Sequence, residues 1–245
     1  MNHPVQKGAA YTLFVLFLIN FLNFFDRALP GVVLEPLRKE FGLTDTLSGA
    51  LGTAFILVYA IAGIPLGRLA DRIQRGHILG AGVAVWSVFT GMAAWVASFP
   101  GLVISRLGVG IGEASCAPAA NSMIGDLYPS HRRARALGLF MLGLPLGSLA
   151  CFALGGWLAQ NYGWRMPFLL AMVPGLIVAV LAWRLPEPTR GQQDTARAAA
   201  PQGNVFRQLL SIRTLWWIIL SGAAINFAAY SLNTFLPDCW CACMV

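Results

Sequence analysis

Charged residues are scarce in this chain of 245 residues: they make up 11% of it, whereas 57% of the residues are hydrophobic. A soluble domain carries about a quarter of its residues as charges. No soluble core could hide this much apolar surface, so the composition excludes a water-soluble domain and predicts an integral membrane protein. The net charge of +7 is therefore better explained by cations that flank apolar segments than by nucleic-acid binding.

Lysine and cysteine are also scarce. Lys7 and Lys39 are the two lysines among 17 basic residues, a bias toward arginine that suits a GC-rich coding sequence. Two of the 5 cysteines, Cys116 and Cys151, fall within apolar segments and the others crowd the C-terminal end, which gives no disulfide framework. Neither a metal-ligand cluster nor a Ser/His/Asp set lies within the apolar segments, so we predict no metal, no cofactor, no catalytic residue and no enzyme.

Apolar runs of about 20 residues, the length that crosses a bilayer, recur along the chain. The first run continues through Asp26 and Arg27 without a small-residue cleavage pattern, which favours a retained helix over a cleaved signal peptide. The predicted spans are 11–33, 47–67, 78–98, 101–127, 136–159, 166–184 and 213–236.

Arginines cluster in alternate loops. Loops 68–77, 128–135 and 184–213 are rich in arginine, whereas connections 99–100 and 160–165 hold little charge. By the positive-inside rule, the Arg-rich loops and the N-terminus lie in the cytoplasm. We therefore expect a multi-pass membrane protein.

A polar stretch, "PEPTRGQQDTARAAAPQGN" at 186–204, follows the sixth apolar run and has the composition of a mobile linker. The predicted fold is all-α: a six-helix transmembrane domain at 1–185, a cytoplasmic linker at 186–212 and a seventh transmembrane helix at 213–236. "GIPLG" at 63–67 returns as "GLPLG" at 143–147, which suggests a three-helix repeat of the kind found in secondary transporters, although chance explains so short a match as well.

The loop "GRLADRIQRG" at 67–76 places Asp71 beside Arg72 and Arg75. A carboxylate between guanidiniums can form charge-assisted pairs that lock helix ends together and that break when the protein changes conformation. The alternative is a set of charges that only fixes topology. The predicted latch consists of Gly67, Asp71, Arg72 and Arg75, together with Asp126, Arg132 and Arg133 in the equivalent loop of the second repeat.

Asp26, Arg106 and Glu113 lie inside apolar runs. Each charge near the bilayer centre costs about 2.5–3.5 kcal/mol, so the three side chains must face the bundle interior or a wet cavity. Arg106 and Glu113 are seven residues apart and project from one helix face, with Asp26 level with the arginine. They form either a static ion pair or a proton site in which Asp26 and Glu113 titrate and Arg106 is their switching partner or an anion-binding group.

Small residues accompany these charges. Glycines at alternate positions after Arg106 are not preceded by a strand, so they do not fit a nucleotide-binding loop, and close helix packing is the expected role. The predicted packing residues are Gly108, Gly110 and Gly112, and Gly143, Pro145 and Gly147 in the next helix.

The loop at 67–76 resembles the signature of the major facilitator superfamily, Gly-x-Leu-Ala-Asp-Arg-x-Gly-Arg-Lys, with Gln74 and Gly76 departing from it. Arg106 and Gly110 resemble the superfamily's Arg-x-x-x-Gly motif. "NFFDR", "GIGEAS", "DLYPSHRRARALG" and "YGWRMPF" are similar to the bacterial Spinster-like branch, and the branch of sugar-acid symporters shares some of these features.

This resemblance implies a twelve-helix transporter with alternating access, of which the chain holds the N-terminal half and helix seven. The implied function is secondary, proton-coupled transport of a small organic or amphipathic molecule across a bacterial inner membrane. The implied partners are a small-molecule substrate, protons, the lipid bilayer and the missing C-terminal half, but no nucleic acid. Two alternatives remain: an organic-anion:proton symporter of the sugar-acid type, and a non-transporting membrane sensor or interaction fragment.

The tail at 237–245 holds cysteines at alternate positions, which do not match a zinc spacing. Reading the back-translated codons of Asp238–Val245 two bases later gives a peptide that resembles the ordinary continuation of Spinster-like bacterial proteins. We therefore expect this tail to be out of frame, with the second half of the transporter encoded downstream.

Overall fold

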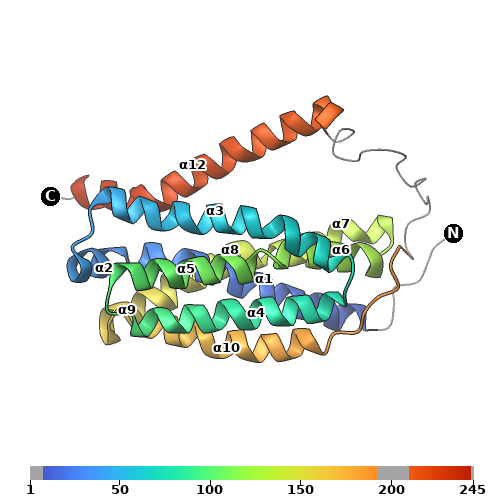
Figure 1. Cartoon of the computed structure of the whole chain (residues 1–245), viewed down its shortest axis with the longest axis horizontal. Coiled ribbons are helices and arrows are strands. Elements are labelled where there is room, and N and C mark those ends of the chain that lie inside the picture. Colours follow the sequence, from blue (N-terminus) through green and yellow to red (C-terminus); the bar gives the residue numbers. More distant parts are fainter. Residues whose placement is uncertain (1–7, 192–209, 244–245) are drawn as a thin grey trace. The chain divides into compact units, whose positions relative to one another are not determined.

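The computed structural model describes residues 8–191 and 210–243, with side chains described for 8–191 and 210–228. Every regular element in these ranges is helical (Figure 1). The helices are α1 (Ala9–Val32), α2 (Leu34–Phe41), α3 (Asp45–Ala70), α4 (Arg75–Met92), α5 (Phe99–Glu113), α6 (Cys116–Leu127), α7 (Ser130–Met141), α8 (Gly143–Ala150), α9 (Gly156–Tyr162), α10 (Met166–Trp183) and α12 (Arg213–Cys243).

Within the described residues, 5 helical segments are long and apolar enough to cross a membrane. They coincide with the predicted spans at 11–33, 47–67, 78–98, 136–159 and 166–184. The third continues past α4 through a 3₁₀ turn at Ala93–Trp95. The segments are Ala9–Val32, Asp45–Ala70, Arg75–Trp95, Ser130–Tyr162 and Met166–Trp183.

The predicted span at 101–127 is interrupted: the helical hydrogen-bond pattern breaks between α5 and α6, at Ala114 and Ser115, although both residues keep a right-handed helical backbone. Pro118 gives the physical reason, because a proline has no N–H to donate to the residue four positions earlier and its ring clashes with that carbonyl. Ser115 Oγ instead donates to the carbonyl oxygen of Gly112 at 2.8 Å. Hydropathy alone does not register this break.

The segment Ser130–Tyr162 is helical along its length but irregular. It is divided at Leu142, between α7 and α8, and a π-helical turn at Cys151–Gly155 joins α8 to α9. Pro145 lies four residues after Met141, so it removes the hydrogen bond that would carry α7 into α8.

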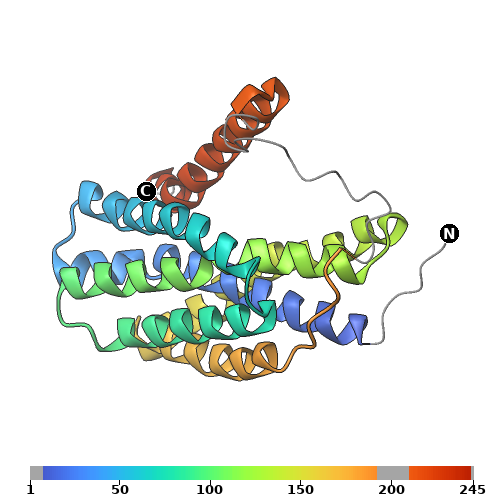
Figure 2. The same cartoon turned by 45° about the vertical axis from the view of Figure 1, so that its right-hand side comes forward.

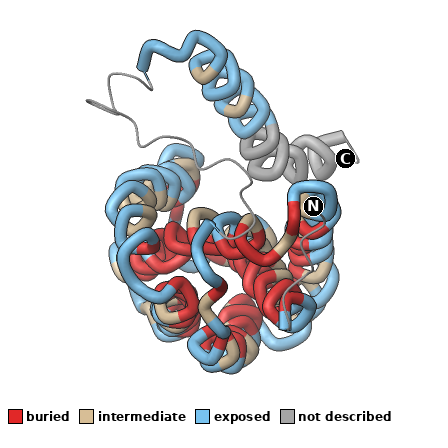
Figure 3. The backbone as a smooth tube through the Cα atoms, turned by 90° about the vertical axis from the view of Figure 1, so that its right-hand side faces the viewer, coloured by how far each residue is buried: buried red, intermediate tan, exposed pale blue. Residues whose placement is uncertain are grey.

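Helices α1 and α4 are the most deeply buried of the long apolar helices among the described residues. In each, 61% of the most apolar window is buried, against 11% in α3. α1 packs against α8 and α10, α4 against α10 and α5, and α3 against α5 (Figures 1 and 2). Buried side chains from α1, α4 and α6, among them Ile19, Trp86 and Met123, form the core at the centre of this ring of helices (Figure 3). Any functional side chain on the inner face of α1 is therefore withdrawn from lipid.

The chain divides into two compact units, residues 1–194 and 195–245. In the second unit α12 contains the predicted span at 213–236, and its described side chains are mostly exposed. Residues 192–209 of the predicted linker lie outside the described residues. So do the side chains of the predicted out-of-frame tail at 237–245.

Candidate functional site

Four charged side chains meet inside the first unit, on α1 and α5. We call Asp26, Arg27, Arg106 and Glu113 the interior cluster. Asp26, Arg106 and Glu113 are 2%, 3% and 0% exposed. Arg27 is the least buried member, with 16% of its side chain exposed. Two arginines and two carboxylates are thus enclosed in an apolar bundle, where their charges can balance only one another.

The firmest contact in the interior cluster is an ion pair between α1 and α5. Arg27 Nε donates to Glu113 Oε2 at 2.7 Å. The guanidinium carbon of Arg27 lies 4.5 Å from the ring centroid of Tyr59 and 5.5 Å from that of Phe55, both on α3. Aromatic faces attract a cation at these distances, so Arg27 is held by a carboxylate on one side and by aromatic rings on the other.

Arg106 and Asp26 are neighbours with a weak contact. Arg106 Nη1 reaches the main-chain oxygen of Asp26 at 3.5 Å, the outer limit for a hydrogen bond. The guanidinium carbon lies 5.2 Å from the ring centroid of Phe168 on α10. Asp26 is close enough to interact electrostatically with both Arg106 and Glu113.

Several polar atoms of the interior cluster lack hydrogen bonds. Among the described residues, no hydrogen bond of normal geometry reaches Asp26 Oδ1, Glu113 Oε1, or Arg106 Nε and Nη2, although the side chains of Thr90 and Asn23 lie near the two carboxylates. An unsatisfied buried polar group costs about 1–3 kcal/mol, and more when the group is charged. A proton on a carboxylate, or an anion or water beside the arginine, would relieve this cost.

The structure brings the predicted trio of Asp26, Arg106 and Glu113 together, but the pairing differs from the sequence interpretation. Glu113 pairs with Arg27, whereas Arg106 had been assigned as the partner of both carboxylates. Arg27 lies in the "NFFDR" motif, and the sequence predicts no role for it. The signal was available, because Arg27 is a full charge within the same apolar run as Asp26.

Glycines allow the helices that carry the interior cluster to approach closely. A Cβ atom on Gly112 of α5 would lie 2.7 Å from the carbonyl oxygen of Gly82 on α4. On α8, Cβ atoms on Gly143 and Gly147 would collide with the backbone of α1 near Phe21. A Cβ on Gly108 would enter the Phe89 ring, and one on Gly110 would lie 3.1 Å from the carbonyl oxygen of Phe55.

A second group of charges lies at the Arg-rich end of the bundle, around Arg75 at the start of α4. Arg75 is 1% exposed. Its Nη1 donates to Asp126 Oδ2 at 2.6 Å and to Ser122 Oγ at 2.7 Å, both on α6. Its Nε and its main-chain N donate to the two carboxylate oxygens of Glu187, at 2.8 and 2.9 Å. We call Arg75, Asp126, Glu187 and Arg190 the end cluster.

The end cluster includes residues that sequence analysis had placed in a mobile linker. Glu187 binds Arg75, and Arg190 donates to the carbonyl oxygens of Ala70, Asp71 and Ile73 at the end of α3. The predicted linker at 186–212 therefore starts as a segment attached to α3, α4 and α6. The missed signal was an acid and an arginine, three residues apart, directly after a predicted helix.

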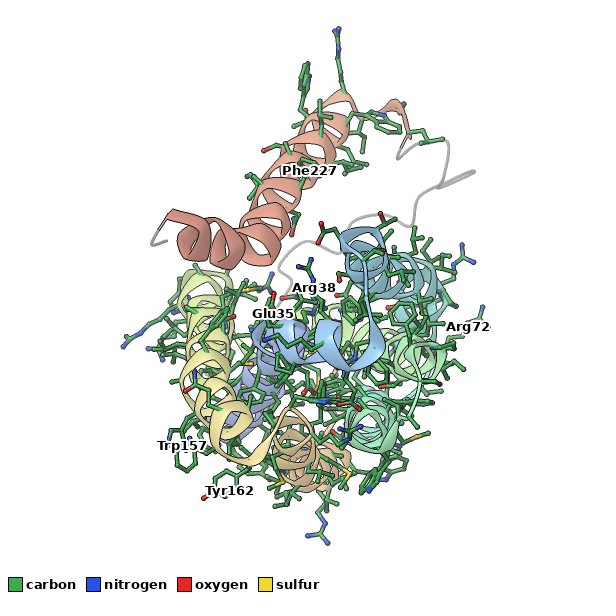
Figure 4. All side chains as sticks on the ribbon, turned by 90° about the vertical axis from the view of Figure 1, so that its left-hand side faces the viewer. Glu35, Arg38, Arg72, Trp157, Tyr162 and Phe227 are labelled. Carbon is green, nitrogen blue, oxygen red and sulfur yellow. The ribbon has the colours of Figure 1, made fainter. Side chains whose placement is uncertain are left out.

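The other predicted latch residues are more peripheral. Asp71, Arg72 and Arg132 are exposed, and Arg72 extends away from the ribbon (Figure 4). Arg133 Nη2 donates to the carbonyl oxygen of Gly125 at 2.7 Å, which ties α7 to the end of α6. The structure thus joins Arg75 to Asp126 but not to the Asp71 side chain.

Comparisons with known proteins agree with this helical arrangement. The family model described as Major Facilitator Superfamily matches residues 16–238. The chain is 32% identical to an MFS-type efflux pump of Mycolicibacterium smegmatis, over 91% of this chain and 52% of that protein. It is 31% identical to a probable L-galactonate transporter of Escherichia coli, over 95% of this chain and 54% of that protein.

Among solved structures, a bacterial homologue of the human lysosomal transporter Spinster, in an inward-facing and unoccupied conformation, matches with a TM-score of 0.77 and 32% identity. The match covers 95% of this chain and 55% of that one. The chain spans about half the length of the curated relatives it matches. It belongs to the major facilitator superfamily of membrane transporters, in the Spinster-like branch, and is an all-α, multi-pass membrane protein.

Proposed function

We propose that this chain is the N-terminal half of a secondary transporter that moves a small organic or amphipathic molecule by alternating access, coupled to protons. Alternating access requires two halves that rock about a central site. The second half is a partner that the chain needs for a full cycle. The proposed role is transport and not enzymatic catalysis.

The observation that carries the proposal is the interior cluster with its unsatisfied carboxylate oxygens. Asp26 Oδ1 and Glu113 Oε1 have no hydrogen-bond partner among the described residues. A carboxylate that is buried and loses its arginine partner favours its neutral form, and one that regains the partner favours its charged form. Separation of Arg27 from Glu113 as the helices move would therefore load a proton, and renewed pairing would release it.

Orientation follows from the arginines. The end cluster and the exposed Arg72 and Arg132 lie at the end of the bundle that we place in the cytoplasm, together with the N-terminus. We propose the inner membrane of a bacterium as the location. The interior cluster then lies nearer the outer side, and the latch residues lie at the cytoplasmic side.

A sugar acid or other organic anion is a second candidate substrate. Arg106 Nε and Nη2 have no hydrogen-bond partner among the described residues, and a guanidinium offers two parallel N–H groups to a carboxylate. The relative from Escherichia coli is named as a probable L-galactonate transporter. An anion bound at Arg106 would accept the hydrogen bonds that Nε and Nη2 of this arginine do not make within the described residues.

The test is uptake into proteoliposomes, using the chain as given and a version continued in the shifted reading frame. L-galactonate and an amphipathic lysophospholipid serve as probes, each with and without an inward pH gradient. We expect the continued version to accumulate one probe only when the gradient is present. Binding without uptake by the continued version would instead favour a membrane sensor or interaction protein. Accumulation that is the same with and without the pH gradient would mean that transport is not coupled to protons.

A further inference from the structure

An apolar groove opens on the surface of the first unit. It has a volume of about 280 Å³ and lies between α3, α4 and α5, with Trp183 of α10 at one end. Several lining side chains are well exposed, including Leu69 at 42% and Ile111 at 47%. An exposed apolar surface of a membrane protein packs either against hydrocarbon or against another protein segment, and the charges beside the groove distinguish the two.

The length of the groove fits one acyl chain in one leaflet. Its lining on α4 runs from His77 to Val85, which corresponds to about 12 Å at 1.5 Å per residue. A single leaflet contributes about 15 Å of hydrocarbon, half the bilayer core. Because the lining runs along the helices, an acyl chain in the groove would lie parallel to them.

Three exposed arginines are sequence neighbours of residues that line the groove. Arg68 and Arg72 adjoin the lining residues Leu69 and Ile73, and Arg184 follows Trp183. All three arginines are exposed, and Figure 4 shows Arg72 extending away from the bundle. His77, whose ring packs against that of Trp183 with centroids 5.0 Å apart, also lines the groove.

Few carboxylates compete for these arginines. Asp71 is the acid that lies among them in the sequence, while Asp126 and Glu187 are bound to Arg75. Basic groups at a membrane surface attract anionic lipids by about 1 kcal/mol each. The charge beside the groove therefore favours an anionic headgroup over the apolar surface of a further helix.

We propose that the groove binds one acyl chain of an anionic phospholipid, with the phosphate among Arg68, Arg72 and Arg184. The lipid belongs to the leaflet on the Arg-rich side. It acts as a bound lipid that covers α3, α4 and α5, not as the transported molecule. The proposal stands whether or not the interior cluster carries protons.

The full chain in phosphatidylcholine nanodiscs provides the test. Increasing mole fractions of phosphatidylglycerol or of phosphatidylcholine, each with brominated acyl chains, are added as quenchers. The signal of Trp183 is the difference between the chain and its Trp183→Phe variant. We expect the anionic lipid to quench Trp183 at a several-fold lower mole fraction than the neutral lipid.

Two matched pairs of variants locate the lipid. Arg184→Gln should raise the mole fraction needed by about five-fold, the effect of about 1 kcal/mol per arginine, whereas Arg135→Gln, on α7, should leave it unchanged. Val85→Phe, which fills the groove, should weaken quenching, whereas Val88→Phe, similarly exposed on α4 but outside the groove, should not. Equal quenching by both lipids would overturn the proposal, and so would equal behaviour of the two variants within each pair. If neither lipid quenches Trp183, a protein segment covers the groove and the proposal is also wrong.

Discussion

Arg75 and Arg106 show how differently one chain treats two buried arginines. They are 1% and 3% exposed. The guanidinium of Arg75 donates to Asp126, Glu187, Ser122 and Pro188 at 2.6–3.2 Å. Arg106 makes one hydrogen bond, at 3.5 Å, and its Nε and Nη2 have no hydrogen-bond partner among the described residues. A fully bonded buried charge can hold helices together, whereas a poorly bonded one is costly and suits a group whose partner comes and goes.

The largest effect on stability should come from Arg75→Ala. This change leaves Asp126 and Glu187 without their buried cation, which should lower the free energy of unfolding by about 3–5 kcal/mol. Thermal or denaturant unfolding in detergent measures the loss. Arg72→Ala is the matched control, because Arg72 is exposed, and it should change stability by less than about 0.5 kcal/mol. Equal losses from the two variants would mean that the end cluster does not hold the helices.

Gly147→Ala should have the next largest effect, because it pushes α8 away from α1 and so disturbs the helix that carries Asp26. The added Cβ would collide with the carbonyl oxygen of Phe21. Overpacking of this kind costs about 1–3 kcal/mol in unfolding free energy. Gly138→Ala is the control, because nothing lies within 4 Å of its Cβ position, and it should be neutral or slightly stabilising. Equal unfolding free energies of Gly147→Ala and Gly138→Ala would mean that the close approach of α1 and α8 does not contribute to stability.

Arg106→Met tests the difference between Arg106 and Arg75, because it removes a buried charge that makes few hydrogen bonds. We expect a change in unfolding free energy of less than about 1 kcal/mol, or a gain, since a buried charge exchanged for an apolar side chain is often neutral or stabilising. Gradient-driven uptake by the continued transporter should be lost. A destabilisation as large as that of Arg75→Ala would show that Arg106 is a structural residue like Arg75.

The smallest effect concerns a third charged contact, between α2 and the two residues that precede α10. Hydrogen bonds from Arg165 and from Trp164 Nε1 hold the pKa of Glu40 below its ordinary value of 4.5. A lowered pKa adds stability that is complete above that value and is lost as the pH falls through the lowered pKa. Because the pair is solvent-screened, the loss should be at most about 1 kcal/mol.

Unfolding measured between pH 6 and pH 3 in the chain and in Glu40→Gln tests this contact. The unfolding free energy of Glu40→Gln should fall less between pH 6 and pH 3 than that of the unchanged chain, because the variant has no carboxylate at residue 40 to protonate. Identical pH profiles would mean that the contact adds no stability.

The sequence predicted the helical fold because apolar runs and arginine-rich loops are properties of single segments. It missed the break at Ala114 and Ser115, since hydropathy does not register the backbone effect of Pro118. It also missed the attached segment at 186–191, because polar composition does not reveal that Glu187 and Arg190 bind helix ends far away in the sequence.

The interior cluster was predictable in part. Charges inside apolar runs single out Asp26, Arg106 and Glu113 by their cost alone. Their partners depend on how α1 and α5 pack, and residues 27 and 113 are brought together only by the fold. For that reason the pairing of Arg27 with Glu113 could not be derived from spacing, although Arg27 itself could have been proposed.

The most direct test of the contrast between the clusters is the same substitution in each, Glu113→Gln and Glu187→Gln, in the continued transporter. Substrate exchange between equal concentrations needs no net proton movement, whereas accumulation against a gradient does. We predict that Glu113→Gln keeps exchange but loses accumulation driven by a pH gradient, and that Glu187→Gln is less stable but keeps the proton dependence. Accumulation by Glu113→Gln with an unchanged pH profile would contradict the proton-coupling role of the interior cluster.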